Sequence, residues 1–327
     1  MLRQNIIPTL PCLLLLAACN QPFDPRAPLK EQLVVFSILS TDRDVQFVRV
    51  QTTYMPPDFD PLTHVSENPV TDAVVNIRGP SASYVLRDTI LARQNTSRYK
   101  FPMHAYVLKP FVPQRGLWYD VIVQSPTFGT AFATVVVPEK TAISISAVGQ
   151  STLYFPDRHG PDAIIQYQAN VSHYAKGYVG RLFIDYDVLN GTQWVEERIE
   201  VPIVSGAGEE KRYTLEAAVY PRLTPKPSTT QTGFVFRNGY YNAMVNHLRS
   251  TVYPQRRITF NRVVFQLLQV EENLYLYYNL VGAYEDPRSI RLDAPSHSNI
   301  DGGIGLVGAY SLDSLVQILP ENFIGNQ

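Results

Sequence analysis

Short runs of apolar or alternating side chains, separated by turn residues, recur along most of this chain and restrict its fold more than any other feature. Residues 33–39 form a nearly continuous apolar run, and residues 164–174 alternate apolar with polar side chains. Asn190-Gly191, between two further runs, favours a two-residue β-hairpin turn. A period of two indicates strands, and the prolines and glycines between the runs end them. The sequence therefore predicts a mainly β protein.

The strand candidates divide into two groups. Those in residues 31–138 have the spacing and turn signals of a sandwich, and we expect an immunoglobulin-like β-sandwich there. The Cys-Trp-Cys core of antibody domains is absent, so this expectation concerns the architecture alone. Pro138 ends the last strand of the group, because proline cannot donate a hydrogen bond to a ladder. Residues 139–327 predict a second β-rich domain with one or two short helices.

Two stretches of the second domain have helical spacing instead. In residues 238–249 and again in residues 271–284, apolar side chains recur at the three- and four-residue spacing of one helix face. The first face consists of Tyr241, Met244, Val245 and Leu248, and the second of Leu274, Tyr277, Tyr278 and Val281. We expect the second face to pack in the core rather than to contact a ligand. Residues 258–270, between the two helices, are the longest strand candidate.

Residues 1–18 have the organisation of a signal peptide, because Arg3 precedes an apolar segment that ends in small residues. The apolar segment is shorter than the ~20 residues that span a bilayer as a helix. Leu16-Ala17-Ala18-Cys19 looks like the bacterial lipobox, which implies cleavage between Ala18 and Cys19 and a diacylglycerol on the Cys19 thiol. An ordinary secreted protein that is cleaved before a cysteine is the alternative.

Cysteine usage favours the lipoprotein over this alternative. The chain has two cysteines, and Cys12 lies in the segment that would be removed. Cys19 then has no partner for an intramolecular disulfide, and a single exported thiol makes sense if it carries lipid. Residues 19–30 contain three prolines and predict an extended tether between the lipid and the first domain.

Charge gives no sign of a nucleic-acid partner. The formal net charge is −1, which provides no attraction to nucleic acid or to an anionic membrane surface. Beyond the signal peptide, no apolar run has the length of a membrane span, so we expect contact with the membrane through the lipid alone. No cofactor is expected besides the covalent diacylglycerol on Cys19.

Glycines near the C-terminus have the spacing of a dinucleotide-binding fingerprint without its context. Gly303-Ile-Gly305-Leu-Val-Gly308 fits G-x-G-x-x-G, but the fingerprint needs a strand before it and a helix after it. Residues 309–311 have strand-like composition, so turns with positive φ and close backbone packing before a final strand are favoured. We assign this structural turn motif to Asn299, Asp301, Gly302, Gly303 and Gly305.

Candidate chemistry is otherwise sparse. Asp301-Gly302-Gly303 offers oxygen atoms to Ca²⁺, but no ladder of further acidic residues surrounds it, so a turn is favoured and metal binding near Asp301 stays open. The six histidines are scattered, and neither a zinc motif nor a G-x-S-x-G elbow occurs. No metal site and no catalytic residue is therefore predicted, and we expect the chain not to be an enzyme.

The proline-rich loop at residues 54–69 is the best binding candidate. It is long, and it carries Tyr54, Met55 and Phe59 on a frame stiffened by prolines. Long loops on a rigid β scaffold often carry binding residues, although a plain surface loop is the favoured interpretation.

Several pieces in order resemble an uncharacterised lipoprotein family of Bacteroidota-type bacteria, a domain of unknown function. The matching pieces are the lipobox, Leu33–Val35, Pro69–Val75, Gly116–Val123, Ala133–Pro138 and Ser298–Gly305. The family is often encoded beside TonB-dependent outer-membrane receptors, and this resemblance implies such a receptor as a partner. Its surface-export signals place acidic residues directly after the cysteine, whereas Asn20–Phe23 follows Cys19 here. Periplasmic and outward display therefore both stay open.

We therefore expect a lipid-anchored outer-membrane protein that binds a ligand or an envelope partner. The alternative is an envelope hydrolase that acts on glycan or peptide with two carboxylates across a cleft. The ligand and the oligomeric state cannot be deduced from the sequence.

Overall fold

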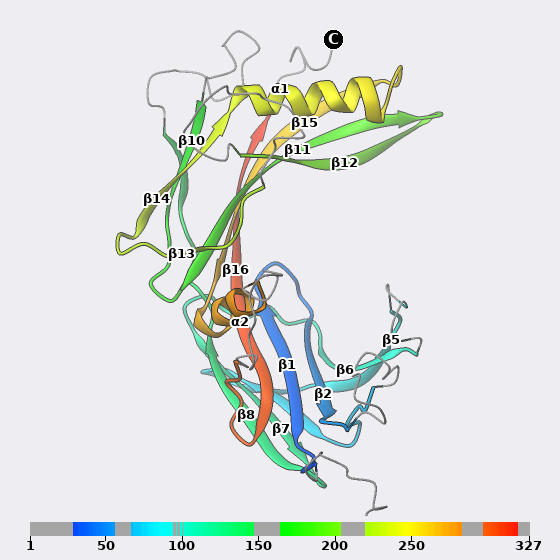
Figure 1. The fold of residues 1–327 in the computed structure, drawn as a ribbon, viewed down its shortest axis with the longest axis vertical. Coiled ribbons are helices and arrows are strands. Elements are labelled where there is room, and N and C mark those ends of the chain that lie inside the picture. The colour runs from blue at the N-terminus through cyan, green and yellow to red at the C-terminus, as the bar shows by residue number, and fades with distance from the viewer. Residues whose placement is uncertain are drawn as a thin grey trace, which may run out of the picture. The chain divides into compact units, whose positions relative to one another are not determined.

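β-Strands dominate the fold, and those in the described part of the chain form three sheets (Figure 1). The computed structural model describes residues 29–55, 67–93, 96, 99, 101–146, 164–203, 220–282 and 297–319. The chain divides into two units, residues 1–31 and residues 32–327, and every element described below belongs to the second.

The largest sheet has nine strands in the order β12-β11-β15-β16-β1-β2-β6-β5, with β13 beside β11. Its strands are β1 (Leu33–Ser40), β2 (Gln46–Thr52), β5 (Arg87–Leu91), β6 (Met103–Leu108), β11 (Gly177–Asn190), β12 (Gln193–Val201), β13 (Thr224–Pro225), β15 (Ile258–Val270) and β16 (Gly303–Ile318). A four-stranded sheet has the order β4-β3-β7-β8, and its strands are β3 (Val74–Arg78), β4 (Ser83–Val85), β7 (Trp118–Ser125) and β8 (Gly129–Val136). A three-stranded sheet has the order β14-β10-β9, and its strands are β9 (Ile143–Ser146), β10 (Ile164–Asn170) and β14 (Gln231–Arg237).

The last strand, β16, joins the two halves of the nine-stranded sheet. Its first half pairs in parallel with β1, from Gly303 opposite Leu33 to Tyr310 opposite Ser40. Its second half pairs antiparallel with β15, from Tyr310 opposite Val270 to Ile318 opposite Arg262. Figure 1 shows the strand in red, running from beside β1 to beside β15. Although the sequence division places β16 in the second domain, half of it completes the sheet of the first.

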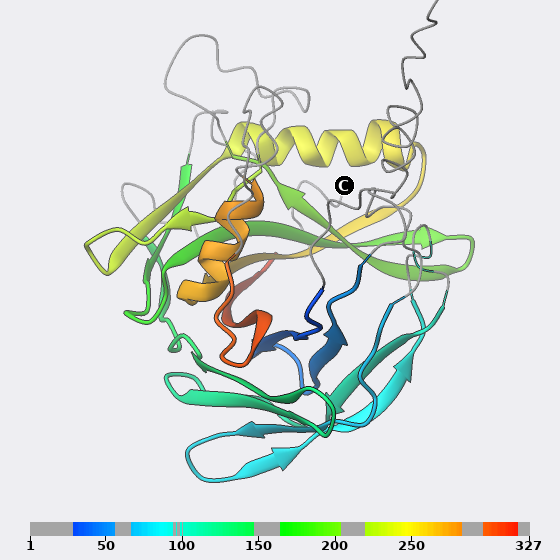
Figure 2. The same ribbon diagram turned by 60° about the horizontal axis from the view of Figure 1, so that its bottom comes forward.

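The four-stranded sheet packs against the part of the nine-stranded sheet that contains β1, β2 and β16. In Figure 2 it lies below β1 and β2. We call the side chains packed between these two sheets the valine core, because ten valines supply half of its buried residues. The strands alternate as the sequence predicts, so that in β7 Tyr119, Val121 and Val123 are buried while Trp118 is exposed. From β16, Val307 and Ala309 enter the same core.

The three-stranded sheet and helix α1 (Asn238–His247) cover the other half of the large sheet. We call the space between them the aromatic core, which contains seven buried tyrosines and phenylalanines. Phe265 and Tyr167 stack at its centre with ring centroids 4.4 Å apart and an interplanar angle of 5°. Helix α1 continues into the π-helical turn η3 (Leu248–Val252). The predicted helix face is confirmed, since Tyr241, Met244, Val245 and Leu248 are all buried.

A buried polar layer lies between the two cores. The Asp313 carboxylate of β16 forms an ion pair with Arg115 and accepts a hydrogen bond from the Thr141 backbone N at 3.0 Å. The Gln269 side-chain nitrogen donates to Thr141 Oγ1 at 2.7 Å, and its oxygen accepts from the Ser172 backbone N at 2.7 Å. Because these polar groups hydrogen-bond to one another, the charged Asp313 side chain can be buried between two apolar cores.

Helix α2 (Glu272–Gly282) lies on the outer face of the nine-stranded sheet, across β16. A Cβ at Gly308 would come within 2.9 Å of Leu274 Cβ, so glycine allows the helix this close approach. Glu271 caps the helix by accepting hydrogen bonds from the backbone N of Asn273 and of Leu274, both at 2.7 Å. The predicted core face of this helix is only partly right, because Leu274 is buried but Tyr278 is 51% exposed. The side chain of Val281 lies outside the described set.

The prediction of a mainly β protein with one or two short helices is confirmed, and the described residues contain two α-helices, α1 and α2. The hairpin at Asn190-Gly191 is also confirmed, since Asn190 pairs with Gln193 and Gly191 has a φ of 63°. Among the described residues, no helix has the length and apolarity that crossing a membrane requires.

Candidate functional site

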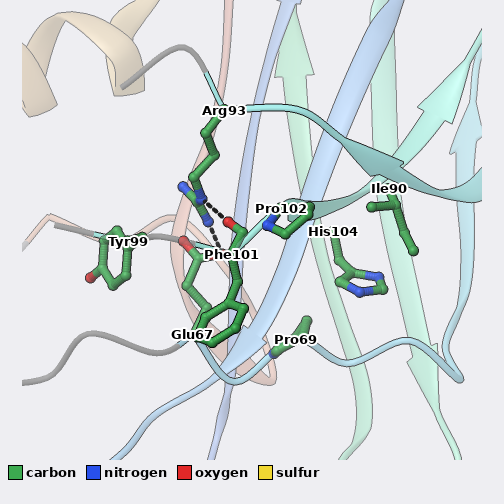
Figure 3. Close-up of a pocket in the computed structure, with 8 residues that line it drawn as sticks. All are labelled: Glu67, Pro69, Ile90, Arg93, Tyr99, Phe101, Pro102 and His104. Atoms are coloured by element: carbon green, nitrogen blue, oxygen red, sulfur yellow. Dashed lines mark hydrogen bonds and ion pairs between the residues drawn. The ribbon is translucent and has the colours of Figure 1, made fainter. Parts of the chain in front are cut away.

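A hollow of about 340 Å³ opens beside the ends of β5 and β6 (Figure 3). Its lining combines apolar, aromatic and ionic side chains from three segments of the chain. The lining residues are Glu67, Pro69, Ile90, Arg93, Tyr99, Phe101, Pro102 and His104. Two of the apolar members are strongly exposed, Phe101 at 69% and Ile90 at 64%. Such exposure of large apolar side chains at the mouth of a hollow is typical of a binding surface.

Glu67 is the ionic centre of this hollow. Its carboxylate pairs with Arg49 of β2, with Oε1 and Nη2 2.6 Å apart, and it also pairs with Arg93. The Arg93 Nε donates to the Phe101 carbonyl oxygen at 2.7 Å, and its guanidinium lies 5.2 Å from the Tyr99 ring centroid. Figure 3 shows Arg93 reaching Glu67 and the Phe101 backbone. Arg93 therefore ties the segment before β6 to the segment that contains Glu67.

Backbone pairing with β2 holds the Glu67 segment in place. Pro69 forms an isolated bridge with Gln51, and Val70 N donates to Val50 O at 3.0 Å. The Tyr106 hydroxyl then donates to Val70 O at 2.9 Å and accepts from Ala73 N at 3.1 Å. Burial raises the pKa of Tyr106, so its hydroxyl stays protonated and remains a donor at neutral pH.

The predicted binding loop borders a second, smaller hollow of about 240 Å³. Tyr54 lines it together with Glu67 and Tyr99, which line the first hollow too, so the two hollows adjoin. Met55 is 40% exposed. Phe59 lies outside the described residues. The structure therefore brings one of the three predicted loop residues into contact with a hollow.

The chemistry of the joined hollows follows from their charges and walls. Arg49 and Arg93 together outweigh the single carboxylate of Glu67, so the ionic cluster carries one positive charge. Phe101, Ile90 and the prolines add apolar walls around it. This arrangement suits a ligand or a partner segment with an apolar or aromatic group beside a hydrogen-bond acceptor or an anion.

The glycine-rich turn before β16 supports backbone packing. Gly302 and Gly305 have φ values of 76° and 125°, and a Cβ on either would come within 2.1 Å of a carbonyl oxygen, that of Thr130 or Val35 respectively. At Gly303 the corresponding approach, to Leu33 O, is 2.7 Å. A strand rather than a helix follows these glycines.

Side chains on either side of the turn complete this packing. The Asn299 side chain mimics a strand, since Nδ2 donates to Val307 O at 2.7 Å and Oδ1 accepts from Val307 N at 2.9 Å. The backbone of Asp301 pairs with Phe132 of β8. Within the described residues, no cluster of three or more histidine, cysteine, aspartate or glutamate side chains is placed to hold a metal.

A shallow hollow on the outer face of the nine-stranded sheet contains several carboxylates, which bears on the hydrolase alternative. It is lined by Asp185, Glu196, Glu197, Arg198 and Arg262. Burial opposes ionisation of Asp185, but hydrogen bonds from Arg198 and Arg262 outweigh it and hold the pKa of this carboxyl below its usual value. A general acid needs a raised pKa, so this aspartate has the opposite property.

The predicted anchor lies outside the described residues. These begin at residue 29, so neither Ala18 and Cys19 nor most of the tether at residues 19–30 is described.

The sequence did not single out Glu67, Arg93 and Phe101. Glu67 lies near the end of the predicted loop, and Arg93 and Phe101 lie in an irregular stretch with no periodic pattern. Their common feature is a spatial one, because the bridge between Pro69 and Gln51 brings the loop end beside β2. No spacing of residues along the chain encodes that approach.

Comparison with known proteins identifies the family. The model described as "Domain of unknown function (DUF4249)" matches residues 20–315, which is most of the sequence. No curated protein matches the chain. The match agrees with the resemblance to an uncharacterised family of unknown function. The chain belongs to the DUF4249 family.

Proposed function

We propose that this chain is a lipid-anchored outer-membrane protein that binds a ligand or an envelope partner at the joined hollows around Glu67 and Tyr99. The observation that carries the binding function is the exposure of Phe101 and Ile90 beside a fixed ionic cluster. Large apolar side chains that remain exposed at a hollow favour a partner that covers them.

The lipid anchor rests on the sequence around Cys19. A diacylglycerol on this thiol, together with acylation of the new amine, supplies enough buried methylene groups for stable attachment. The tether at residues 19–30 would hold the folded unit away from the bilayer. Intact mass of the protein purified from its own membranes tests the anchor, because a lipidated chain is heavier than the chain cleaved at Cys19 by the mass of its acyl groups. A mass without acyl groups would overturn it.

The proposed partner is a TonB-dependent receptor, and this choice rests on the resemblance alone. The test is capture of the native, lipidated protein from its own outer membrane, followed by mass spectrometry of the proteins recovered with it. We expect stoichiometric recovery of a receptor. Recovery of the protein alone would refute the proposal that it forms a stable complex with such a receptor.

A pair of variants connects such a partner to the hollow. Phe101→Ala removes the most exposed apolar side chain of the hollow, whereas Phe132→Ala removes a phenylalanine of 45% exposure from β8, outside the hollow. We expect Phe101→Ala to lose the partner and Phe132→Ala to retain it. Equal recovery with both variants would show that the partner binds elsewhere.

A further inference from the structure

A second constellation of exposed aromatic side chains lies apart from the residues that line the hollows described above. Trp118, the first residue of β7, is 53% exposed, and its ring meets that of Tyr174 edge to face, with centroids 6.1 Å apart and an interplanar angle of 78°. The His173 ring packs against Tyr174, with centroids 3.7 Å apart. Trp118 and His173 are exposed, and the Tyr174 ring that contacts both is half-buried. We call this surface, formed by three rings from two distant segments, the Trp118 platform.

A turn locked by buried groups holds the platform rigid. Ala175 N donates to Ser172 O at 3.1 Å, which closes a β-turn with His173 and Tyr174 at its two central positions. Ser172 is itself buried, and its backbone N donates to the Gln269 side chain at 2.7 Å. The backbone that carries His173 and Tyr174 is therefore held in place before any ligand binds, which lowers the entropy cost of binding.

A carboxylate borders the rings. Glu139 Oε2 lies 3.0 Å from His173 Nδ1 and accepts a hydrogen bond from Ser172 Oγ at 3.2 Å. Its other oxygen, Oε1, accepts no hydrogen bond from any residue that the structure describes, and the side chain is 44% exposed. The Tyr174 hydroxyl and the Trp118 ring N–H likewise make no hydrogen bond within the described part of the chain.

Polar groups continue along the same face of β7. Because side chains alternate along a strand, Asp120 lies on the face of Trp118, about 6.6 Å further along. Asp120 accepts hydrogen bonds from Arg78 Nη2 and from Thr134 Oγ1, each at 2.6 Å. These three side chains are all solvent-accessible donors or acceptors fixed relative to one another.

From this geometry we infer that the Trp118 platform is a carbohydrate-binding site. A pyranose ring presents a face of C–H groups, which packs on an aromatic ring, and a rim of hydroxyl groups, which need donors and acceptors at the edge. The platform offers both, with Trp118 and Tyr174 for the face and Glu139, His173 and Asp120 for the rim. Val136 lies opposite Trp118 on β8 but is nearly buried, so the accessible groups at the edge of the rings include Glu139, His173 and Asp120. These groups match the hydroxyl rim of a sugar better than the aliphatic core of a protein interface.

The only two tryptophans of the chain provide a matched experiment. Trp194 on β12 is 48% exposed, close to the exposure of Trp118, but it lies by Arg257, and among the described residues no aromatic ring packs against it. Trp194→Phe leaves Trp118 as the sole tryptophan fluorophore, and Trp118→Phe leaves Trp194. Both variants are titrated with cellohexaose, laminarihexaose, maltoheptaose, chitohexaose and mannohexaose, and binding is also measured by calorimetry.

We expect at least one of these oligosaccharides to shift the emission of Trp118 in Trp194→Phe in a saturable manner, with no shift in Trp118→Phe. Trp118→Ala should weaken the calorimetric affinity for that sugar by about tenfold or more, whereas Trp194→Ala should leave it unchanged. Circular dichroism and the urea midpoint of each variant show that it folds. Tyr174→Phe, which keeps the ring and loses only the hydroxyl, should weaken binding by less than Trp118→Ala.

Two outcomes would overturn the inference. The first is that no oligosaccharide of the panel perturbs Trp118 or produces heat of binding at millimolar concentration. The second is that Trp118→Ala abolishes capture of a protein from outer-membrane extract, while no oligosaccharide changes the tryptophan emission or produces heat of binding. That result would make the platform a protein interface. Both results are independent of the Phe101→Ala experiment, since the two sites share no residue.

Discussion

The two cores that share the nine-stranded sheet are filled in different ways. The valine core lies between two sheets and contains small β-branched side chains, whereas the aromatic core lies between a sheet, a smaller sheet and helix α1 and contains large rings. Valine suits two closely packed sheets, because its branched side chain fills the pleated surface without reaching far. Rings fill the wider and less regular space beneath a helix, where edge-to-face and stacked pairs add to burial.

The difference shows that one sheet can supply a layer to two unlike interiors. Strand β16 contributes Val307 and Ala309 to the valine core and Leu315 to the packing of the aromatic core. The buried polar layer around Asp313 and Gln269 marks the change between them. The tryptophans report on the two sides, since Trp118 lies on the sheet that closes the valine core and Trp194 lies on β12, beside the aromatic core.

The largest expected effect is that of removing the central ring of the aromatic core. Phe265→Ala should lower the free energy of unfolding by about 3–5 kcal/mol, because the neighbouring rings of Tyr167, Phe234 and Phe236 cannot close the cavity. Urea unfolding followed separately through Trp118 and Trp194 in the single-tryptophan variants measures it. Both reporters should shift together, since the cores share a sheet. A shift of the Trp194 curve alone would show that the cores unfold independently.

The polar layer should give the next largest effect. Asp313→Asn keeps the volume of the side chain but removes the charge that faces Arg115, so we expect a loss of about 2–3 kcal/mol in the free energy of unfolding. The value stays below that of a fully buried pair because Arg115 is partly exposed to solvent. The two tryptophan reporters should again shift equally. If their midpoints separate, the polar layer rather than the strand backbone couples the cores.

A matched pair of methyl deletions compares the packing of the cores directly. Ile184→Val in the aromatic core and Ile77→Val in the valine core remove the same group from fully buried positions. Each should cost about 0.5–1.5 kcal/mol of unfolding free energy, and the cost should be larger at Ile184, where rigid rings relax less. Urea midpoints measured under identical conditions decide this. A larger cost at Ile77 would contradict the expected difference in packing.

The smallest effect concerns the outer face beside the aromatic core. The folded-state pKa of Asp185 lies below its usual value, so its ionised form stabilises the fold above the ordinary carboxyl pKa of about 4, and this stability is lost as pH falls through the folded-state pKa. Asp185→Asn should therefore cost no more than about 1 kcal/mol at pH 7, because its arginine partners are substantially exposed.

The pH dependence provides the check on this prediction. Unfolding free energies of the native chain and of Asp185→Asn should converge as pH is lowered below about 4. Glu272→Gln is the control, because Glu272 forms an exposed ion pair with Lys176. This substitution should leave the decrease of the unfolding free energy at acid pH unchanged. A difference between the native chain and Asp185→Asn that is constant across pH would refute the assignment.

The sequence allowed some elements of the aromatic core to be predicted closely. The apolar run at 258–270 matches β15 residue for residue, and the helical face at 238–249 matches α1 and its continuation. The periodicity of these elements extends over many residues, so the local sequence pattern is enough to determine whether each is a strand or a helix.

Other elements depend on distant partners and were missed. Strand β14 follows a stretch with several prolines, and it is a strand because it pairs with β10. Only Leu86 separates β4 from β5, yet the two strands belong to different sheets. The hollow around Glu67 and the Trp118 platform are likewise built from segments that are separate in sequence. No local sequence motif therefore predicts either of them.

The position of β16 also sets the order in which the chain can finish folding. Leu33 pairs with Gly303, so the first strand must wait for almost the whole chain to be synthesised before its second edge is covered. Contacts this distant in sequence form slowly, and an uncovered strand edge can pair with other chains in the meantime. A chain that stops before residue 303 leaves both cores open at their shared boundary. The open edge of β1 is therefore covered only when residues 303–310 pair with it, after nearly the whole chain has become available for folding.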